Sequence, residues 1–335
     1  MKPKISIITP CYNQGRFLEE NIVSVINQGY PNTEHIVIDD GSTDNTKEVL
    51  EQYKGNLAYS TTQRNSGQSD ALNKAFDKAT GEIIGWLNSD DYYAPGALNA
   101  VAEAFSDPAV NVVCGYSILF NDEGLHEKAP PTITETRGLE FHLRFPDINQ
   151  PPTFFRRKTM AEITPLNTAL KYVMDREMWI KYLQLYGINH TKTLNDILVY
   201  FRYHSTSNSQ TKVDKFDDDY ATILHWLALK NNLTEVANAL ASRYELVPSY
   251  TYSFSKYPDA ETTLNMIRFF FLKRGGLVYN ESEFEYAKKG YKVFGIKNYK
   301  PLPEEKNALQ RMESIVSSIN WLHFRVKRKI SYING

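Results

Sequence analysis

The stretch that decides the fold runs from residue 5 to residue 13 and reads Ile5-Ser6-Ile7-Ile8-Thr9-Pro10-Cys11-Tyr12-Asn13. Its first four residues form a short apolar run rich in β-branched side chains. Such a run is typical of a buried strand, and Thr9-Pro10 ends it. Apolar residues then recur at helical spacing from Phe17 to Ile26, and Gly29-Tyr30-Pro31 stops the helix that they predict. The segment therefore predicts one strand followed by one helix.

The same alternation repeats along the first half of the chain. Strands are predicted at residues 35–38, near 57–61, at 83–87 and at 111–120, and helices at about 43–53, 68–78 and 95–105. Strands that alternate with helices indicate right-handed βαβ units, and these build a parallel sheet with helices on both faces. We therefore expect an α/β fold.

The character of the chain changes in its second half. A helix is predicted at about residues 175–186 and a strand at 197–203. From about residue 213 onward, helical patterns near 216–230, 233–245 and 260–273 dominate. We expect two domains, an α/β domain over residues 1–212 and a mostly helical C-terminal region over residues 213–335.

Composition excludes several classes of protein. The chain of 335 residues has 38 Lys and Arg against 39 Asp and Glu, which argues against a dedicated nucleic-acid binder. Two cysteines, Cys11 and Cys114, are too few for a disulfide framework or a cysteine-based zinc site. The apolar stretches are shorter than the ~20 residues of a membrane-spanning helix. The apolar run at residues 5–8 is also too short for a signal peptide. We expect a cytoplasmic protein without a nucleic-acid partner.

Polar residues gather where three of the predicted strands end. They lie at Thr9 to Asn13, at Asp39 to Ser42 and at Asn88 to Asp91. In parallel sheets, ligands bind beyond the carboxyl ends of the strands. The three polar clusters together therefore predict a ligand site at that edge.

Each acidic cluster also has a purely structural interpretation. Carboxylates at Asp39 and Asp40 can accept hydrogen bonds from a ligand, but an Asp-Gly-Ser turn equally caps a helix. Oxygens at Asn88 to Asp91 suit Mg²⁺ or Mn²⁺ bound to substrate phosphates, whereas the same residues can simply form a polar turn. Both interpretations stay open for these two clusters.

Two further residues are candidates for chemistry. Asp175 lies in an apolar setting, where desolvation raises the pKa of a carboxyl toward that of a general base. The alternative is that Asp175 caps the helix that follows. His204 comes after a strand and before a hydroxyl-rich loop, so it could ligate a metal or bind phosphate. An isolated His of this kind is more often a partly buried surface residue.

Together these segments resemble a known family. Residues 5–13, 37–46, 81–98 and 172–179 are similar to the inverting glycosyltransferases of family 2, and the resemblance covers about residues 4–210. It implies the GT-A fold, a nucleotide-sugar-binding α/β domain. It also implies transfer of a hexosyl or N-acetylhexosaminyl group from a nucleoside-diphosphate sugar, by default a UDP-sugar. The implied acceptor is a hydroxyl of a glycan or lipid-linked molecule, as in bacterial polysaccharide assembly.

The resemblance assigns binding roles residue by residue. It implies a nucleotide pocket made by Thr9, Pro10, Tyr12, Asn13, Asp39, Asp40, Arg64, Gly67 and Gln68. It implies contacts with the donor sugar or diphosphate from Asn88, Ser89 and Asp91.

The resemblance also implies a catalytic base, Asp175, and a divalent cofactor, Mn²⁺ or Mg²⁺, held by Asp90 and His204. One position departs from the family's Asp-x-Asp pattern, because its first acid is Asn88 here. An amide can still bind a sugar or ribose hydroxyl through its carbonyl oxygen, but it brings no charge. Metal binding would then depend more on Asp90, with Asp91 and His204 as helpers.

Other classes of protein fit less well. A nucleotidyltransferase would need a glycine-rich basic loop near the N-terminus, but residues 9–16 hold one Gly and one Arg. A dinucleotide oxidoreductase would need Gly-x-Gly-x-x-Gly after the first strand, and that motif is missing there. A non-catalytic nucleotide-sugar-binding protein on the same fold stays open because of Asn88, although Asp175 argues against it.

Two segments have a less specific pattern. Residues 150–157 are expected near the acceptor or the sugar, where Arg156 and Arg157 could contact phosphate or simply be surface charges. Residues 321–330 mix aromatic and basic side chains, which suits peripheral contact with the inner face of the cell membrane. A solvated helix face has the same pattern.

Overall fold

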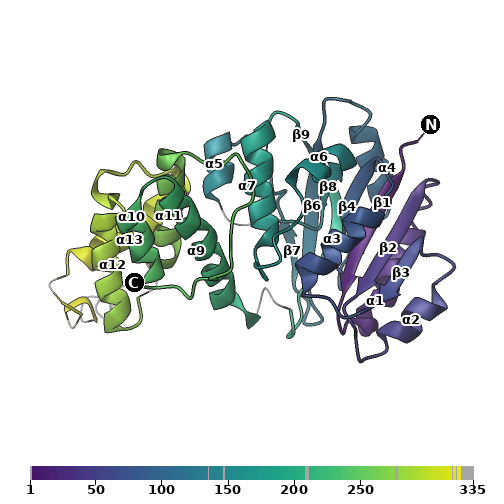
Figure 1. Cartoon of the computed structure of the whole chain (residues 1–335), viewed down its shortest axis with the longest axis horizontal. Coiled ribbons are helices and arrows are strands. Elements are labelled where there is room, and N and C mark those ends of the chain that lie inside the picture. Colours follow the sequence, from purple (N-terminus) through teal and green to yellow (C-terminus); the bar gives the residue numbers. More distant parts are fainter. Residues whose placement is uncertain are drawn as a thin grey trace. The chain divides into compact units, whose positions relative to one another are not determined.

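The structure is a computed structural model that describes residues 2–134, 136–145, 148–207, 211–275, 278–318, 320–321 and 323–325. The chain forms two compact units (Figure 1). Unit one comprises Met1–His142 and Asp147–Asp219, and unit two comprises Leu143–Pro146 and Tyr220–Gly335. The candidate site lies in unit one, so that unit is described first.

Unit one is built on a nine-stranded sheet in the order β3-β2-β1-β4-β8-β6-β9-β5, with β7 paired to β6. The strands are β1 (Ile5–Cys11), β2 (Thr33–Asp39), β3 (Tyr59–Thr62), β4 (Ile83–Trp86), β5 (Tyr92–Tyr93), β6 (Val112–Phe120), β7 (His126–Ala129), β8 (Thr153–Arg156) and β9 (Thr191–Arg202). The first four strands pair in parallel, and β9 is parallel to β6. The carboxyl ends of β1, β2 and β4 therefore meet at one edge.

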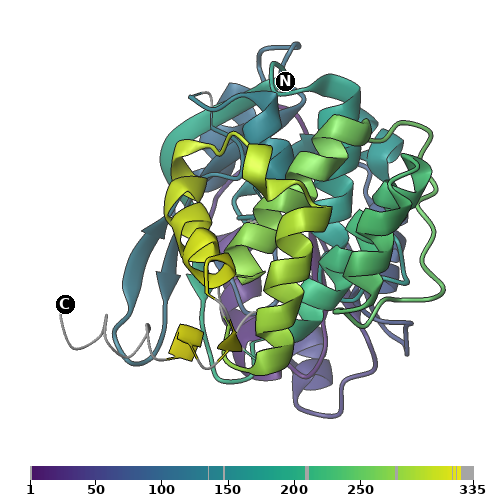
Figure 2. The same cartoon turned by 90° about the vertical axis from the view of Figure 1, so that its left-hand side faces the viewer.

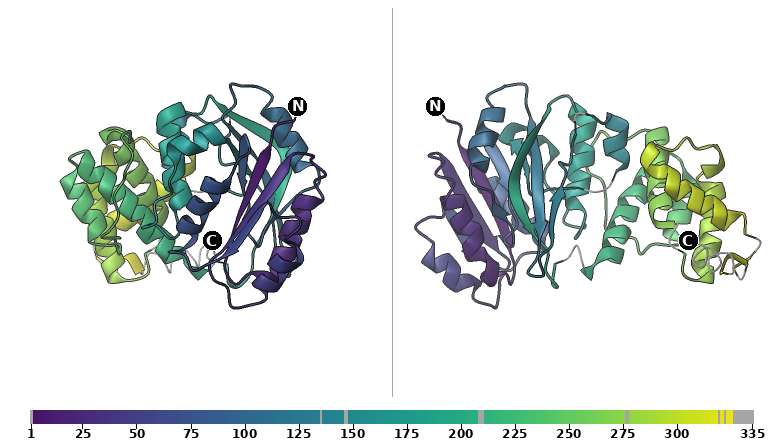
Figure 3. Two further views of the ribbon diagram at one scale, coloured as in Figure 1. Left: turned by 45° about the vertical axis from the view of Figure 1, so that its right-hand side comes forward. Right: turned by 180° about the vertical axis from the view of Figure 1, so that it is seen from behind.

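Helices cover both faces of this sheet (Figure 3). They are α1 (Gly15–Ile26), α2 (Thr46–Gln52), α3 (Gln68–Lys78), α4 (Ala97–Ala104), α6 (Arg157–Ile163) and α7 (Met174–Tyr186). α3 contacts β1 and β2, α6 contacts β4 and β8, and α4 contacts β9. Two further helices, α5 (Leu139–Arg144) and α9 (Val213–Lys230), run across the division between the units.

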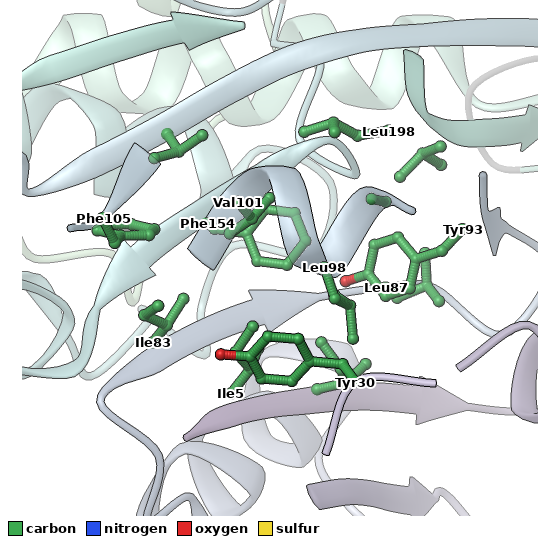
Figure 4. Packing of buried hydrophobic residues seen from close by; sticks show 14 of the residues in the cluster. Ile5, Tyr30, Ile83, Leu87, Tyr93, Leu98, Val101, Phe105, Phe154 and Leu198 are labelled. Carbon is green, nitrogen blue, oxygen red and sulfur yellow. The ribbon is translucent and has the colours of Figure 1, made fainter. Parts of the chain in front are cut away.

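The core of unit one explains why the sheet edge is well defined. Ile5 of β1 and Ile83 of β4 lie against Leu98 and Val101 of α4 (Figure 4), and all four side chains are fully buried. Each such side chain contributes about 1.5–3 kcal/mol by leaving water. Alternation along β1 directs every second side chain into this core. The register of β1 is thereby specified, and with it the position of the polar residues that follow.

The expected fold class is confirmed, with one difference in the sheet. α3 spans residues 68–78 as predicted, and α1, α7 and β4 lie within a few residues of their predicted bounds. The strand β8 was not predicted, and it runs antiparallel between β4 and β6. Four residues are too few for periodicity to separate strand from loop, so pairing with distant strands decides this element.

The two arginines next to β8 bind the protein's own backbone. The Arg156 guanidinium donates to the carbonyl oxygens of Val110, Phe105 and Asp107, at 2.5, 2.9 and 2.7 Å. Arg157 Nε donates to the carbonyl oxygen of Gly81 at 2.9 Å. These contacts favour a structural role for both side chains over the phosphate contact that the sequence suggested.

Unit two is helical, as expected for the C-terminal region. Beyond Asp219 it contains the rest of α9, then α10 (Thr234–Ala241), α11 (Ala260–Gly275), α12 (Glu281–Val293) and α13 (Lys306–Val316), with short 3₁₀ turns at Ile296–Asn298 and Pro303–Glu305. α11, α12 and α13 contact one another (Figure 2, green to yellow). Within the described ranges, no helix combines the length and apolar character needed to cross a bilayer.

Two predictions about this region stay predictions. The domain boundary expected at residue 212 lies inside unit one, which extends to Asp219. The membrane contact expected from residues 321–330 falls mostly outside the described residues, because residue 322 and residues 326–335 are among those that the structure does not describe.

Candidate functional site

A cavity of about 930 Å³ opens at the carboxyl ends of β1, β2 and β4. It is lined by ten of the residues predicted from the sequence: Pro10, Tyr12, Asn13, Asp40, Gly67, Gln68, Asn88, Ser89, Asp90 and Asp175. These residues come from three strand exits, from the start of α3 and from the first turn of α7. The fold thus gathers around one space side chains that are up to 165 positions apart in the chain (175 − 10).

Three predicted nucleotide-binding residues do not line the cavity. The Thr9 hydroxyl is fully buried and lies 2.9 Å from His35 Nε2. The buried Asp39 carboxylate accepts the Ser42 N–H and hydroxyl, so it holds its own turn and does not cap α2, which begins at Thr46. Arg64 is exposed outside the lining. Of the two neighbouring acids at the end of β2, Asp39 and Asp40, only Asp40 lines the cavity.

The loop before α3 is shaped by Asp40 and Gly67. One Asp40 oxygen accepts the backbone N–H of Asn65, which ties the end of β2 to this loop. Gly67 has φ 104° and ψ −177°, a conformation open to glycine and strained for other residues. This turn brings Gln68 to the cavity wall.

Asn88 is held by the protein through its side-chain oxygen. Its Oδ1 accepts hydrogen bonds from Trp86 Nε1 at 2.9 Å and from Gln68 Nε2 at 3.2 Å. An amide oxygen has two lone pairs, so both are engaged. The expectation that Asn88 binds a hydroxyl through its carbonyl oxygen stays a prediction, and these two contacts do not use the NH₂ group of the side chain.

The turn at residues 88–91 is held by two residues that the sequence analysis did not single out. Asn21 of α1 is fully buried, and its Nδ2 donates to the carbonyl oxygens of Asn88 and Asp91, at 2.8 and 2.9 Å. From β9, Arg202 donates its backbone N–H to Asp91 Oδ1 at 3.0 Å and its Nε to the Asp90 carbonyl oxygen at 3.3 Å. The sequence feature that could have identified Asn21 is its position as a polar residue on an otherwise apolar helix face.

Asp91, the last residue of this turn, does not line the cavity. Its side chain is buried, and in the described part of the chain its Oδ2 has no hydrogen-bond partner. Burial and the neighbouring negative charge of Asp90 raise the Asp91 pKa well above the usual value. The structure therefore gives Asp91 a different environment from Asp90, which faces the cavity.

The two predicted metal ligands lie next to each other. Asp90 Oδ2 is 3.0 Å from His204 Nε2, and His204 Nδ1 is 2.9 Å from the Thr206 hydroxyl. His204 itself packs against the ring of Phe17, with ring centroids 4.9 Å apart. Counting only described residues, no group of three or more His, Cys, Asp or Glu side chains could hold a metal. One carboxylate and one imidazole still fit Mn²⁺ or Mg²⁺, because substrate phosphates commonly complete the ligand set of these ions.

Asp175 lies on the cavity wall in the first turn of α7. Its Oδ1 accepts the Arg176 N–H at 2.8 Å, so one oxygen also satisfies a free N–H of the helix start. Burial raises the Asp175 pKa to about 6. A carboxyl with that pKa is mostly ionised near neutral pH, so it can accept a proton from a bound hydroxyl.

Comparisons with known proteins agree with this architecture. Residues 6–173 match the family model described as Glycosyl transferase family 2. An uncharacterized glycosyltransferase of Nostoc sp. is 27% identical over 267 residues, which cover 76% of this chain and 82% of that protein.

Two solved structures share the fold. Residues 1–349 of S. aureus TarS in complex with UDP-GlcNAc give a TM-score of 0.58 at 16% identity, over 93% of this chain and 90% of that one. The mannosyltransferase PcManGT from Pyrobaculum calidifontis, in complex with GDP-Man and Mn²⁺, gives 0.50 at 17% identity, over 98% and 87%. These likenesses support the GT-A fold expected from the resemblance. Because the family model matches half of the chain's length, the chain belongs to glycosyl transferase family 2.

Proposed function

We propose that this chain is an inverting glycosyltransferase that moves a sugar from a nucleoside-diphosphate donor, by default a UDP-sugar, to an acceptor hydroxyl. One observation carries the proposal: Asp40, Asp90 and Asp175, from three separate segments of the chain, line the same cavity. The TarS complex with UDP-GlcNAc and the PcManGT complex with GDP-Man support a nucleotide-sugar donor. The acceptor is proposed to be a glycan or lipid-linked molecule, from the family resemblance.

The donor would lie along the strand exits. Asp40 and Asn13 flank the proposed nucleotide end, together with the loop that begins α3. The turn at residues 88–91 flanks the proposed diphosphate end. Thr9 and Asp39 would act on the nucleotide only through the residues they contact, because they do not line the cavity, and Arg64 also lies outside the lining.

The reaction would be a single displacement with inversion at the anomeric carbon. Asp175 accepts the proton of the acceptor hydroxyl, and that oxygen forms a bond to the anomeric carbon from the face opposite the nucleotide. The bond between the anomeric carbon and the diphosphate oxygen breaks, and its electron pair leaves with the diphosphate. Orientation and base catalysis each supply orders of magnitude in rate.

Asp90 and His204 would hold a divalent cation against the diphosphate. Such an ion supplies positive charge that stabilises a departing diphosphate. The Mn²⁺ in the PcManGT complex supports divalent-metal use among proteins of this fold. Asn21 and Arg202 would keep Asp90 in place through the backbone of its turn.

A donor panel tests the proposal. Nucleotide release is measured from a set of UDP- and GDP-sugars, with and without Mn²⁺. Release of the nucleoside diphosphate from at least one donor is expected, and no release from any donor would contradict the proposal. Pyrophosphate release with a sugar phosphate and a nucleoside triphosphate would indicate a nucleotidyltransferase. Tight binding without turnover would indicate a non-catalytic binder.

The pH dependence of transfer follows from the Asp175 pKa. Because burial raises that pKa to about 6, the base is protonated at lower pH. We expect kcat/KM to rise about tenfold per pH unit below pH 6 and to level off above about pH 7. The profile is measured from about pH 5 to 8.5, with thermal unfolding as the control for folding. A flat profile across this range would contradict the assignment of Asp175.

Removal of the imidazole should weaken metal use. In His204→Ala, we expect the Mn²⁺ concentration for half-maximal activity to rise about 10–100-fold, since the ion loses one of two proposed protein ligands. Titration of activity with Mn²⁺ measures this shift. His126→Ala, which removes an exposed imidazole from β7, is the control and should leave the midpoint unchanged. Equal midpoints for the two variants would exclude His204 from the metal site.

A further inference from the structure

The segment that leads to Asp175 has no helix or strand of its own. Residues 164–173 run without regular secondary structure into α7, whose second residue is Asp175. Three of these residues, Leu170, Lys171 and Tyr172, line the same cavity as Asp175. Helix and strand hydrogen bonds do not hold this segment. Its position depends on turn hydrogen bonds within it, such as the Leu170 N–H to the Asn167 carbonyl oxygen at 3.2 Å, and on side chains of other elements.

Side chains of α3 hold the far end of the segment. Asn73 donates its Nδ2 to the Leu166 carbonyl oxygen at 2.9 Å and accepts the Leu166 N–H at 2.7 Å. The Ser69 hydroxyl donates to the Leu170 carbonyl oxygen at 3.1 Å. These contacts leave the last residues before α7 to be held by another element.

Asp219 of α9 holds that last part. Its Oδ2 accepts the backbone N–H groups of Lys171 and Tyr172, both at 2.8 Å. The Asp219 side chain is buried, so water competes little for these hydrogen bonds. Hydrogen bonds to a carboxylate are roughly twice as strong as neutral ones. Two successive N–H groups directed at one oxygen orient two neighbouring peptide planes, only three residues before Asp175.

The same helix also contacts the Tyr172 side chain. The ring of Phe216, three residues before Asp219 on α9, lies 5.3 Å from the Tyr172 ring at 41°, and both residues line the cavity. Residues three apart lie on the same face of a helix. One face of α9 therefore contacts Tyr172 through both its backbone and its ring, beside the proposed base.

We propose that Asp219 is a positioning residue for transfer, which holds Asp175 and the Tyr172 wall of the cavity in place through the N–H groups of Lys171 and Tyr172. The inference rests on the proposed function, and it adds a residue that does not line the cavity. A base must lie within hydrogen-bond reach of the hydroxyl that it deprotonates. A displacement of about 1 Å can lower a rate about 100-fold.

The test compares three variants of the full chain. Asp219→Ala removes the acceptor oxygen, Asp219→Asn keeps an amide oxygen that can accept both N–H groups, and Asp214→Ala removes an exposed acid from the first turn of α9. Hydrogen exchange of the Lys171 and Tyr172 amides, measured without ligand, is the first readout. We expect exchange about tenfold faster or more in Asp219→Ala, and near wild-type exchange in the other two.

Kinetics provide the second readout, with the UDP- or GDP-sugar that wild type turns over fastest. For Asp219→Ala we expect kcat to fall about 10–100-fold while KM for the donor stays within about twofold. Asp219→Asn should recover most of the lost rate, and Asp214→Ala should match wild type. A purely structural role would lower the amount of folded protein without this separation of kcat from KM.

Two results would overturn the inference: unchanged exchange at Lys171 and Tyr172 in Asp219→Ala, or faster exchange with kcat within about twofold of wild type. If Asp219→Ala does not fold, Asp219→Ser, whose shorter side chain falls short of both N–H groups, takes its place with the same expectations. If wild type turns over no donor, the proposed function fails, while the exchange result still decides whether Asp219 holds the segment.

Discussion

Asp175→Asn is expected to reduce transfer by about 10²–10⁴-fold while nucleotide binding is retained. An amide is close in size to a carboxylate, so the cavity keeps its shape, but an amide cannot accept the proton of an acceptor hydroxyl. The amide oxygen can still accept the Arg176 N–H that Asp175 accepts now, so the start of α7 should persist. Single-donor kinetics measure the loss of rate, and calorimetric titration with UDP or GDP measures the binding.

A matched control separates loss of the base from loss of a charge. Asp77→Asn makes the same chemical change at an exposed position on α3 and should leave kcat unchanged. Turnover of Asp175→Asn at the wild-type rate would refute the assignment of the base. Loss of both nucleotide binding and turnover would contradict the expectation that the substitution leaves the cavity intact.

Asn21→Asp is expected to lower the free energy of unfolding by about 3–5 kcal/mol at neutral pH. The new oxygen would replace the NH₂ group that now donates to the carbonyl oxygens of Asn88 and Asp91. A buried carboxylate would then face two carbonyl oxygens without a donor, although its size is that of the amide. Urea unfolding at pH 7 measures the loss.

The loss should also depend on pH in a defined direction. Burial without donors raises the pKa of a carboxyl, so the native state binds its proton more tightly than the unfolded state does. The difference in free energy of unfolding between the variant and wild type should therefore shrink as pH falls toward the unfolded-state pKa of about 4. Asn27→Asp, at the exposed end of the same helix, is the control and should change stability by less than about 1 kcal/mol. A small, pH-independent effect in Asn21→Asp would show that the hydrogen bonds of Asn21 contribute little.

Much of the candidate site follows from local patterns. The apolar side chains at residues 5–8 and 83–87 each lie within a single strand. The 3.6-residue period of the helix at 68–78 is likewise visible in its own sequence, without reference to the elements it packs against. Polar residues directly after such strands lie at one sheet edge, since parallel pairing aligns the carboxyl ends. For that reason Asp40, Asn88 and Asp90 were recognisable as one group before any coordinates.

Other features depend on pairs of residues far apart in the chain. Asn21 forms a hydrogen bond with Asn88, 67 positions further along the chain, and Asp91 accepts the Arg202 N–H, 111 positions away. The strand β8 enters the sheet between the strands at residues 83–86 and 112–120. Neither periodicity nor turn chemistry encodes which distant N–H a buried amide or carboxylate will meet.

The amino-acid sequence alone was enough to predict the α/β class, the helical C-terminal region and the group of acids at the strand ends, because these depend on hydrophobic periodicity within single elements. The tertiary structure alone decided that Asp40 and not Asp39 reaches the cavity, that the Asn88 oxygen is already engaged, and that Asp219 holds the segment before Asp175. From the sequence alone, a polar side chain could form hydrogen bonds with many different groups. Only the close packing of distant elements selects one of them.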